Sequence, residues 1–210
     1  MTAASAPVVV ADPGDPRLLA FTGLTDTELR RRVEAEHGLF IVEGITAIER
    51  LLASPYNVHS FLLIERALDR LGDGPAATGA PIYVVGPDVL RAVVGFELHR
   101  GAVAAALRPA PVDAATLLTD ASLVLAVEGV NDHENLGGLF RNAAAFGVDA
   151  VVLDPTCADP LYRRSVRVSM GHVLAVPFAR LAPWPDALGD LQEAGTTVVA
   201  LTPDPDAEPI

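Results

Sequence analysis

Residues 123–153 read LVLAVEGVNDHENLGGLFRNAAAFGVDAVVL, and this stretch decides the fold. The apolar run Leu123–Val127 has the length of a buried strand, and a polar loop follows it. Apolar residues then recur at helical spacing over residues 136–146, and Gly147 stands where a helix end favours a left-handed residue. A second apolar run, Ala150–Leu153, completes a strand–loop–helix–strand unit. Such units form parallel sheets, so the sequence predicts an α/β fold.

One face of the predicted helix carries little side-chain bulk. Gly137, Gly138, Arg141 and Ala145 fall at spacings that place them roughly together, and only Arg141 among them has a long side chain. Two glycines in a first turn cost about 1 kcal/mol each in helix propensity, which favours close approach of another group to the backbone. Asn135 is the candidate N-cap residue. Two interpretations stay open: a ligand-facing surface, or a glycine-rich helix start packed on a sheet with Arg141 in solvent.

Composition limits the classes of protein to which the chain can belong. It has 210 residues, of which 50% are hydrophobic, and this suits one large or two small domains with a sizeable core. The single cysteine, Cys157, excludes a disulfide framework and a metal site built on paired cysteines. No apolar run approaches a membrane span, and the first residues lack the features of a secretory signal. We therefore expect a cytoplasmic protein without membrane contacts.

The elements expected before residue 113 indicate a small α/β domain. Residues 1–16 are rich in Ala, Pro, Gly and Asp and are predicted to be a flexible tail. Residues 17–108 form the predicted domain, and the proline-stiffened run 109–112 is the predicted linker. The expected strands are 40–42, 58–64, 82–85 and 103–107, the expected helices are 25–36, 45–52, 65–71 and 87–94, and residues 72–81 are an expected loop.

The second predicted domain spans residues 113–210. Beside the unit already described, it has expected helices at 113–118, 160–170 and 183–194, and expected strands at 173–178 and 196–201. Asp159 and Pro160 are the expected cap and first residue of the second of these helices.

The charge distribution bears on nucleic-acid binding. The formal net charge is −12, and all 15 basic residues are arginine. An acidic chain has no overall attraction to nucleic acid, so RNA binding would depend on local arginine clusters. Two clusters stand out, Arg30–Arg32 and the set Arg163, Arg164 and Arg167. Each could hold phosphate through bidentate contacts, or could be an ordinary solvated helix face.

Several kinds of catalytic site find no support in the sequence. No Ser/His/Asp set, useful pair of carboxylates or histidine pair for a metal stands out, and His99 before Arg100 is a lone histidine. The glycine fingerprint of dinucleotide-binding folds is absent, because the loop after Val127 is acidic and its glycines come late. This argues against a general α/β nucleotide-binding domain.

Four runs of sequence resemble a known family. EGVNDHENLGGLFRNAAAFGVDAVVL closely resembles the first signature of the SpoU-type RNA ribose 2′-O-methyltransferases of the SPOUT superfamily. YRRSVRVSMGHVLAVPF resembles their second signature, a Ser-x-Gly turn leading into a strand that ends in proline. FIVEG and HRGAVAA are similar to runs in the ribosomal-protein-like RNA-binding module that many such enzymes carry at the N-terminus. The resemblance covers nearly the whole chain after residue 16.

The resemblance implies a fold, a cofactor and partners. The fold would be a parallel-sheet methyltransferase domain of the trefoil-knot family, residues 113–210, preceded by an RNA substrate-binding domain. The cofactor would be S-adenosylmethionine, bound in a bent shape, with no metal. The partners would be rRNA or tRNA and a second copy of the chain, in a homodimer of methyltransferase domains.

The resemblance also assigns residues. Asn135 and Arg141 match the two polar residues of the first signature, and Arg141 would lie at the target ribose. A free guanidinium is a poor base, so we expect Arg141 to orient the hydroxyl or a phosphate and to stabilise oxyanion charge. Ala200, Leu201 and Thr202 match the loop that lines one side of the cofactor. The residues expected to face RNA are Arg30, Arg31, Arg32, Glu43, Arg100, Arg163 and Arg167.

The resemblance stops short of the family's third signature, which closes the knot and the cofactor pocket. The sequence therefore resembles either a fragment of a longer protein or a truncated paralogue. The leading hypothesis is an S-adenosylmethionine-dependent RNA 2′-O-ribose methyltransferase. The alternative is a catalytically inactive or truncated RNA-binding protein of the same fold.

Overall fold

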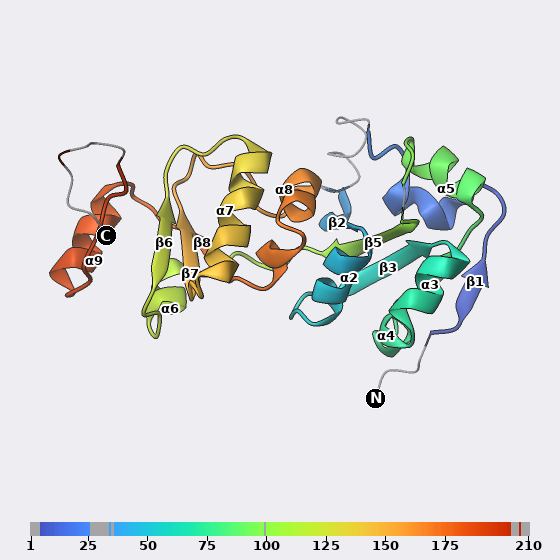
Figure 1. The fold of residues 1–210 in the computed structure, drawn as a ribbon, viewed down its shortest axis with the longest axis horizontal. Helices are drawn as coiled ribbons and strands as arrows, with labels where there is room; N and C mark the ends of the chain where they lie inside the picture. Colours follow the sequence, from blue (N-terminus) through green and yellow to red (C-terminus); the bar gives the residue numbers. More distant parts are fainter. Residues whose placement is uncertain (1–4, 26–33, 35, 99, 203–205, 207–210) are drawn as a thin grey trace.

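The structure is a computed structural model in which residues 5–25, 34, 36–98, 100–202 and 206 are described. Their strands form two sheets, one of five strands and one of three, which lie next to each other along the long axis of the molecule (Figure 1). Within these residues, no helix is both long enough and apolar enough to cross a membrane.

The five-stranded sheet has the order β1-β4-β3-β5-β2. β1, β4 and β3 are parallel, whereas β5 is antiparallel to both of its neighbours. The strands are β1 (Pro7–Val9), β2 (Leu39–Glu43), β3 (Val58–Leu63), β4 (Ile82–Val84) and β5 (Ala102–Leu107).

Helices cover both faces of this sheet. They are η1 (Pro16–Phe21), α2 (Ile45–Leu52), α3 (Glu65–Leu71), α4 (Gly74–Ala77) and α5 (Pro87–Val94). Side chains alternate between the two faces along β2. Phe40 and Val42 pack in one cluster with residues of α2 and α3, and Leu39 and Ile41 pack in another with η1 and α5. Burial on both faces explains why the central strands are apolar at nearly every position.

The three-stranded sheet is parallel, with the order β6-β7-β8. Its strands are β6 (Val124–Val127), β7 (Ala150–Leu153) and β8 (Phe178–Arg180). α7 (His133–Ala145) connects β6 to β7, and α8 (Arg163–Val168) and η2 (His172–Leu174) connect β7 to β8. α6 (Ala114–Leu118) precedes β6, and α9 (Asp186–Glu193) follows β8.

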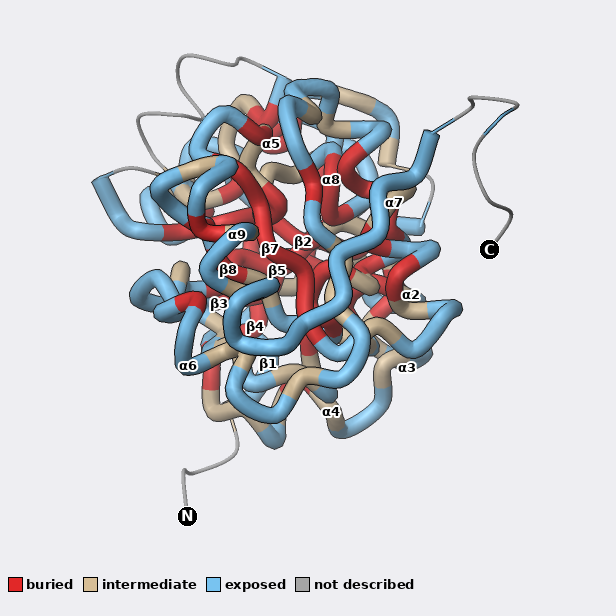
Figure 2. The backbone as a smooth tube through the Cα atoms, turned by 90° about the vertical axis from the view of Figure 1, so that its left-hand side faces the viewer, coloured by how far each residue is buried: buried red, intermediate tan, exposed pale blue. Residues whose placement is uncertain are grey.

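One cluster of buried side chains runs through both sheets. It includes Phe61 of the five-stranded sheet, Leu136 and Phe140 of α7, and Val173 of η2. The ring of Phe140 meets that of Phe178 edge to face, with centroids 5.6 Å apart. In Figure 2 the buried backbone lies mainly in the sheets and on the inner sides of α7 and α8. The two sheets therefore share a core.

Most of the predicted elements are present. The strand–helix–strand unit and its parallel pairing are confirmed. α2, α3 and α5 have the predicted bounds. Gly147 follows α7 with a φ of 68°, which is the left-handed conformation expected there. The predicted helix 25–36 falls largely outside the described residues.

The N-terminal tail is a first correction. Within the predicted tail 1–16, residues Pro7–Val9 form β1 and pair with β4. Val10, which follows the strand, is buried. Three residues carry no periodicity that distinguishes a strand from a loop, and the pairing depends on a partner strand far along the chain.

The predicted strand 196–201 is a second correction. Its composition favours a strand, but the segment lies outside both sheets, and Val199 and Leu201 are 62% and 75% exposed. The N–H of Thr196 instead donates to the carbonyl of Leu191, 2.9 Å away, at the end of α9. A strand is stable only when a neighbouring strand pairs with its backbone.

The boundaries around α8 are a third correction. The helix begins at Arg163 rather than at 160, because the Asp159 carboxylate accepts from the N–H of Leu161 in a turn, 2.9 Å away, instead of capping a helix. η2 occupies the first part of the predicted strand 173–178, so that β8 begins at Phe178. The predicted loop 72–81 contains α4, and α9 begins at Asp186 rather than at 183 or 184.

Asp132, not Asn135, is the N-cap of α7. Its carboxylate accepts hydrogen bonds from the N–H groups of Glu134 and Asn135, at 2.9 and 2.8 Å. We expect Asp132→Ala to lower the free energy of unfolding by about 1 kcal/mol, because two amides at the helix start lose their acceptor. Urea unfolding followed by circular dichroism measures this change. Asn131→Ala, at the exposed neighbouring position, is the control, and equal losses in both variants would contradict the capping role.

Candidate functional site

The loop that leads into α7 is held by a buried carboxylate. Asp154 follows β7, is 3% exposed, and accepts hydrogen bonds from the N–H groups of Gly129, Thr156 and Cys157. Burial alone would raise the pKa of Asp154, but these hydrogen bonds outweigh it and hold the pKa below its ordinary value. Asp154 therefore fixes the loop after β6 to the loop after β7, and this positions the start of α7.

The two glycines of α7 have different surroundings. A Cβ on Gly137 would lie 2.7 Å from the carbonyl oxygen of Ser165, so the backbone of α8 packs directly on this position. A Cβ on Gly138 would meet nothing within 4 Å. Contrary to the prediction from the sequence, Gly137 and Gly138 therefore do not belong to one open face. Gly137 packs against α8, whereas Gly138 faces open space.

Asn135 and Arg141 are both exposed on α7. Asn135 is in the first turn, where its N–H bonds to the capping carboxylate of Asp132. The guanidinium of Arg141 has no hydrogen bond or ion pair to any residue in the described part of the chain. Arg141 lies close enough to His172 to affect its charge. The guanidinium is therefore available to a ligand.

A small basic cluster surrounds Arg141 where the two sheets meet. It consists of Arg50 of α2, Arg141 of α7 and His172 of η2. Burial lowers the pKa of His172 below its ordinary value, and the positive charges of Arg50 and then Arg141 lower it further. Arg50 also donates to the carbonyl of Met170, so that it bridges α2 and the turn after α8.

The lowered pKa of His172 predicts how stability changes with pH. The folded state releases its proton below the ordinary value of 6.5, so the unfolded state binds more protons near and just below that pH. The free energy of unfolding should therefore fall as the pH falls through this window. His172→Gln should make the fall shallower, as measured by urea unfolding between about pH 7.5 and 5.5. His59, whose pKa is lowered by burial and by His37, should leave a residual slope, and equal slopes in both proteins would contradict this assignment.

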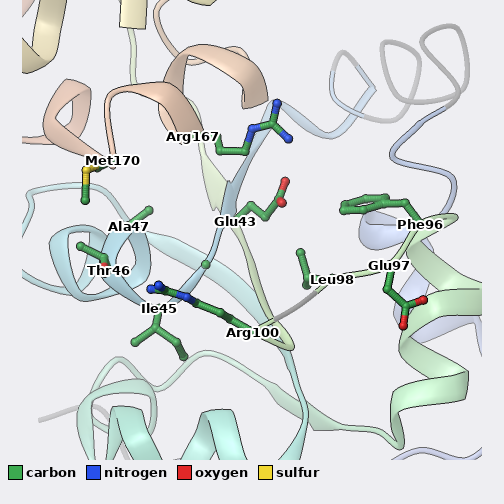
Figure 3. A pocket seen from close by; sticks show the side chains of 11 residues that line it. Glu43, Ile45, Thr46, Ala47, Phe96, Glu97, Leu98, Arg100, Arg167 and Met170 are labelled. Atoms are coloured by element: carbon green, nitrogen blue, oxygen red, sulfur yellow. The ribbon is translucent and has the colours of Figure 1, made fainter. Parts of the chain in front are cut away.

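A pocket opens at the junction between the two sheets (Figure 3). Its volume is about 450 Å³, and its walls come from the start of α2, the segment after α5 and the end of α8. Its lining residues are Glu43, Gly44, Ile45, Thr46, Ala47, Phe96, Glu97, Leu98, Arg100, Arg167 and Met170.

An ion pair closes one side of this pocket. A guanidinium nitrogen of Arg163 lies 2.9 Å from a carboxylate oxygen of Glu43, and both side chains are mostly buried. The guanidinium also lies over the ring of Phe96, 5.0 Å from the centroid. Four of the residues predicted to face RNA thus gather at one place: Glu43, Arg100, Arg163 and Arg167.

Other predicted site residues are not part of this arrangement. Arg30, Arg31 and Arg32 lie outside the described residues. Ala200, Leu201 and Thr202 are exposed, and Figure 1 shows their segment beyond β6, away from α7. Among the described residues, no group of three or more histidine, cysteine or acidic side chains could hold a metal ion.

Sequence reasoning missed Arg50, Phe96 and His172. His172 lies inside the second signature-like run, and that run was a usable signal for it. Arg50 and Phe96 gave no local signal, because their roles depend on contacts with Met170 and Arg163 in the other half of the chain.

Residues 122–210 match the SpoU rRNA Methylase family. The chain is 47% identical over 194 residues to proteins named uncharacterized tRNA/rRNA methyltransferase from Mycobacterium tuberculosis and Mycobacterium bovis, covering 92% of this chain and 67% of each relative. It is 30% identical over 159 residues to a 23S rRNA (guanosine(2553)-2′-O)-methyltransferase from Bacillus subtilis, covering 76% of this chain and 60% of the relative.

Two solved structures are similar in fold. An AdoMet-bound rRNA methyltransferase from Sinorhizobium meliloti matches with a TM-score of 0.70 and 21% identity, over 90% of this chain and 69% of that one. The SpoU methyltransferase AviRb from Streptomyces viridochromogenes matches with a TM-score of 0.66 and 23% identity, over 86% and 66%. The predicted α/β fold of the SPOUT type is confirmed by these similarities.

Proposed function

The chain belongs to the SpoU rRNA methylase family, and on that premise we propose that it transfers a methyl group from S-adenosylmethionine to a ribose 2′-hydroxyl of rRNA or tRNA. The observation that carries the proposal is the 47% identity to named tRNA/rRNA methyltransferases over 92% of the chain. The names of the Bacillus subtilis relative and of a Shewanella oneidensis relative, both 2′-O-methyltransferases of 23S rRNA, support the ribose as the acceptor.

In this proposal Arg141 acts on the RNA. Its guanidinium is exposed and unpaired within the described structure, and it stands beside His172 and Arg50 at the junction of the sheets. A guanidinium stays protonated at neutral pH, so Arg141 orients the hydroxyl or a neighbouring phosphate and stabilises developing negative charge on oxygen. S-adenosylmethionine supplies the methyl group when bound. Asn135, in the first turn of the same helix, helps to shape this surface.

The remaining parts of the proposal concern organisation. Residues 17–108 are the RNA substrate-binding domain, residues 109–112 are the linker and residues 113–210 are the methyltransferase domain. Ala200, Leu201 and Thr202 line the cofactor, and the methyltransferase domain forms a homodimer. We also propose a cytoplasmic location, which an rRNA or tRNA substrate supports. Sequence similarity to the family supports these assignments.

The test is transfer of labelled methyl groups from S-adenosylmethionine to total rRNA and tRNA. Digestion of the product to nucleosides and mass spectrometry should find the label on ribose, as 2′-O-methyl nucleosides. Label on a base would overturn the proposed acceptor. Calorimetry, which measures binding of S-adenosylmethionine, distinguishes the enzyme from the alternative of an inactive protein. RNA binding without cofactor binding or methyl transfer would favour the inactive RNA-binding protein.

A further inference from the structure

The pocket at the junction of the sheets carries two unpaired positive charges. It is lined by two carboxylates and two guanidiniums. Glu43 is paired with Arg163 at 2.9 Å, whereas Glu97 lies 3.8 Å from Arg91 and shares it with Asp88, which is 3.2 Å from Arg91. Arg100 and Arg167 have no acidic partner among the described residues, and both are exposed. The pocket is thus locally cationic in a chain whose formal net charge is −12.

The first turn of α2 adds to this positive character. Gly44 is the N-cap, with a φ of 91°, and no side chain caps the helix. The first amides of α2 therefore have no side-chain acceptor, and the residues that carry them line the pocket, which is a favourable environment for an anion. Figure 3 shows Arg100 extending toward this end of α2. The guanidinium of Arg100 and the first turn of α2 therefore lie near the same part of the pocket, where one phosphate group could interact with both.

Another part of the lining is apolar. Phe96 and Leu98 come from the segment after α5, and Met170 comes from the turn after α8. Met170 is 42% exposed, and its backbone has a φ of 55°, which residues other than glycine rarely adopt. The next residue, Gly171, fixes this turn, because a Cβ there would lie 2.9 Å from the Cα of Ala47. A polarizable thioether held at a cationic pocket suits the face of a nucleobase.

We propose that this pocket binds one nucleotide of the RNA, with its phosphate between Arg100 and the first turn of α2 and its base against Met170. Arg167 contacts a second phosphate of the same strand. The volume of about 450 Å³ is in the range of small-molecule sites. Glu43 and Arg163 form the wall rather than contact the RNA, since each satisfies the other.

The surface between the pocket and Arg141 connects the two sites. Met170 lines the pocket, and its carbonyl accepts from Arg50. Arg50 and Arg141 both lie near enough to His172 to lower its pKa. An RNA strand that runs from the pocket past Met170 therefore meets two guanidiniums, first Arg50 and then Arg141. In this respect the inference rests on the proposed function, with the pocket holding a neighbour of the target nucleotide.

Binding of a fluorescent single-stranded RNA decamer of mixed sequence tests the phosphate contacts. Arg100→Gln and Arg167→Gln should each weaken binding severalfold and lower the slope of log Kd against log salt by about 0.7, the value for one phosphate contact in single-stranded nucleic acid. Arg70→Gln, an equal change of charge on the exposed side of α3, is the matched control and should leave the slope nearly unchanged. Equal slopes in all three variants would overturn the proposal.

A second variant tests the base. Met170→Ala should weaken binding of adenosine monophosphate and of the decamer about two- to tenfold, in line with loss of one sulfur–aromatic contact. It should leave binding of inorganic phosphate unchanged. Equal loss with phosphate alone, or no loss with either nucleotide ligand, would show that the pocket does not hold a base.

The kinetics of methyl transfer separate this inference from the proposed function. Arg100→Gln should raise KM for RNA more than it lowers kcat, because the contact lies away from the reacting atoms. If the wild-type protein methylates RNA but Arg100→Gln keeps its KM and its RNA affinity, the pocket assignment fails and the enzyme assignment stands. If the wild-type protein transfers no methyl group while the variants lose RNA affinity as described, the enzyme assignment fails and the pocket assignment stands.

Discussion

Replacement of Arg141 by alanine should lower the kcat of methyl transfer to RNA about 100- to 1,000-fold, the usual effect of removing one donor that stabilises an oxyanion. The side chain is exposed and lies near His172. It forms no ion pair with a carboxylate of the described structure, so none competes with the RNA for it. Labelled methyl transfer at saturating RNA and S-adenosylmethionine measures kcat. Arg141→Lys should recover only part of the activity, because an ammonium lacks the planar fork of donors.

The control for Arg141 is its neighbour on the same helix. Asn142 is exposed and has no side-chain hydrogen bond within the described residues, so Asn142→Ala should keep near wild-type kcat. Circular dichroism of both variants checks that α7 is intact. Full activity of Arg141→Ala would remove this residue from the mechanism.

Substitution of Gly137 by alanine should lower the free energy of unfolding by about 1–3 kcal/mol, the range for overpacking a close contact. The added methyl group would meet the carbonyl oxygen of Ser165 at 2.7 Å, Cβ of Val168 at 3.0 Å and the amide nitrogen of Ser169 at 3.1 Å. Two of these atoms are backbone, so α8 itself must shift. Urea unfolding of the purified variant gives the change in free energy.

The next residue provides a control of opposite sign. Gly138→Ala places a methyl group where nothing lies within 4 Å. It should raise the free energy of unfolding by up to about 1 kcal/mol, because alanine has the higher helix propensity. If both substitutions changed stability in the same direction, the packing of α8 on Gly137 could not be the cause.

Local sequence patterns predicted most of the helices and strands. α2 and α5 have helical periodicity with a clear stop, at Ser54-Pro55 for α2 and at Gly95 for α5, and their predicted bounds hold. β1 has three residues, and its pairing depends on β4. For residues 196–201 the sequence predicted a strand that the structure does not have. A strand-forming composition is insufficient when no neighbouring strand pairs with the segment.

The candidate site was predictable only in part. The first signature-like run predicted Arg141, and the local density of arginines predicted Arg163 and Arg167. They gave no indication that Glu43 pairs with Arg163 or that Arg50 reaches the carbonyl of Met170. Each of these contacts joins residues that the chain separates by 120 positions, and local periodicity carries no information at that range.

The core shared by the two sheets affects how the molecule unfolds. Because Leu136, Phe140 and Val173 are buried in one cluster with Phe61, part of the interior of each half is completed by the other half. Unfolding of one half would expose apolar surface on the other, so we expect the two sheets to unfold cooperatively. The distances from Arg100 and Arg167 to Arg141 are then kept or lost in a single transition.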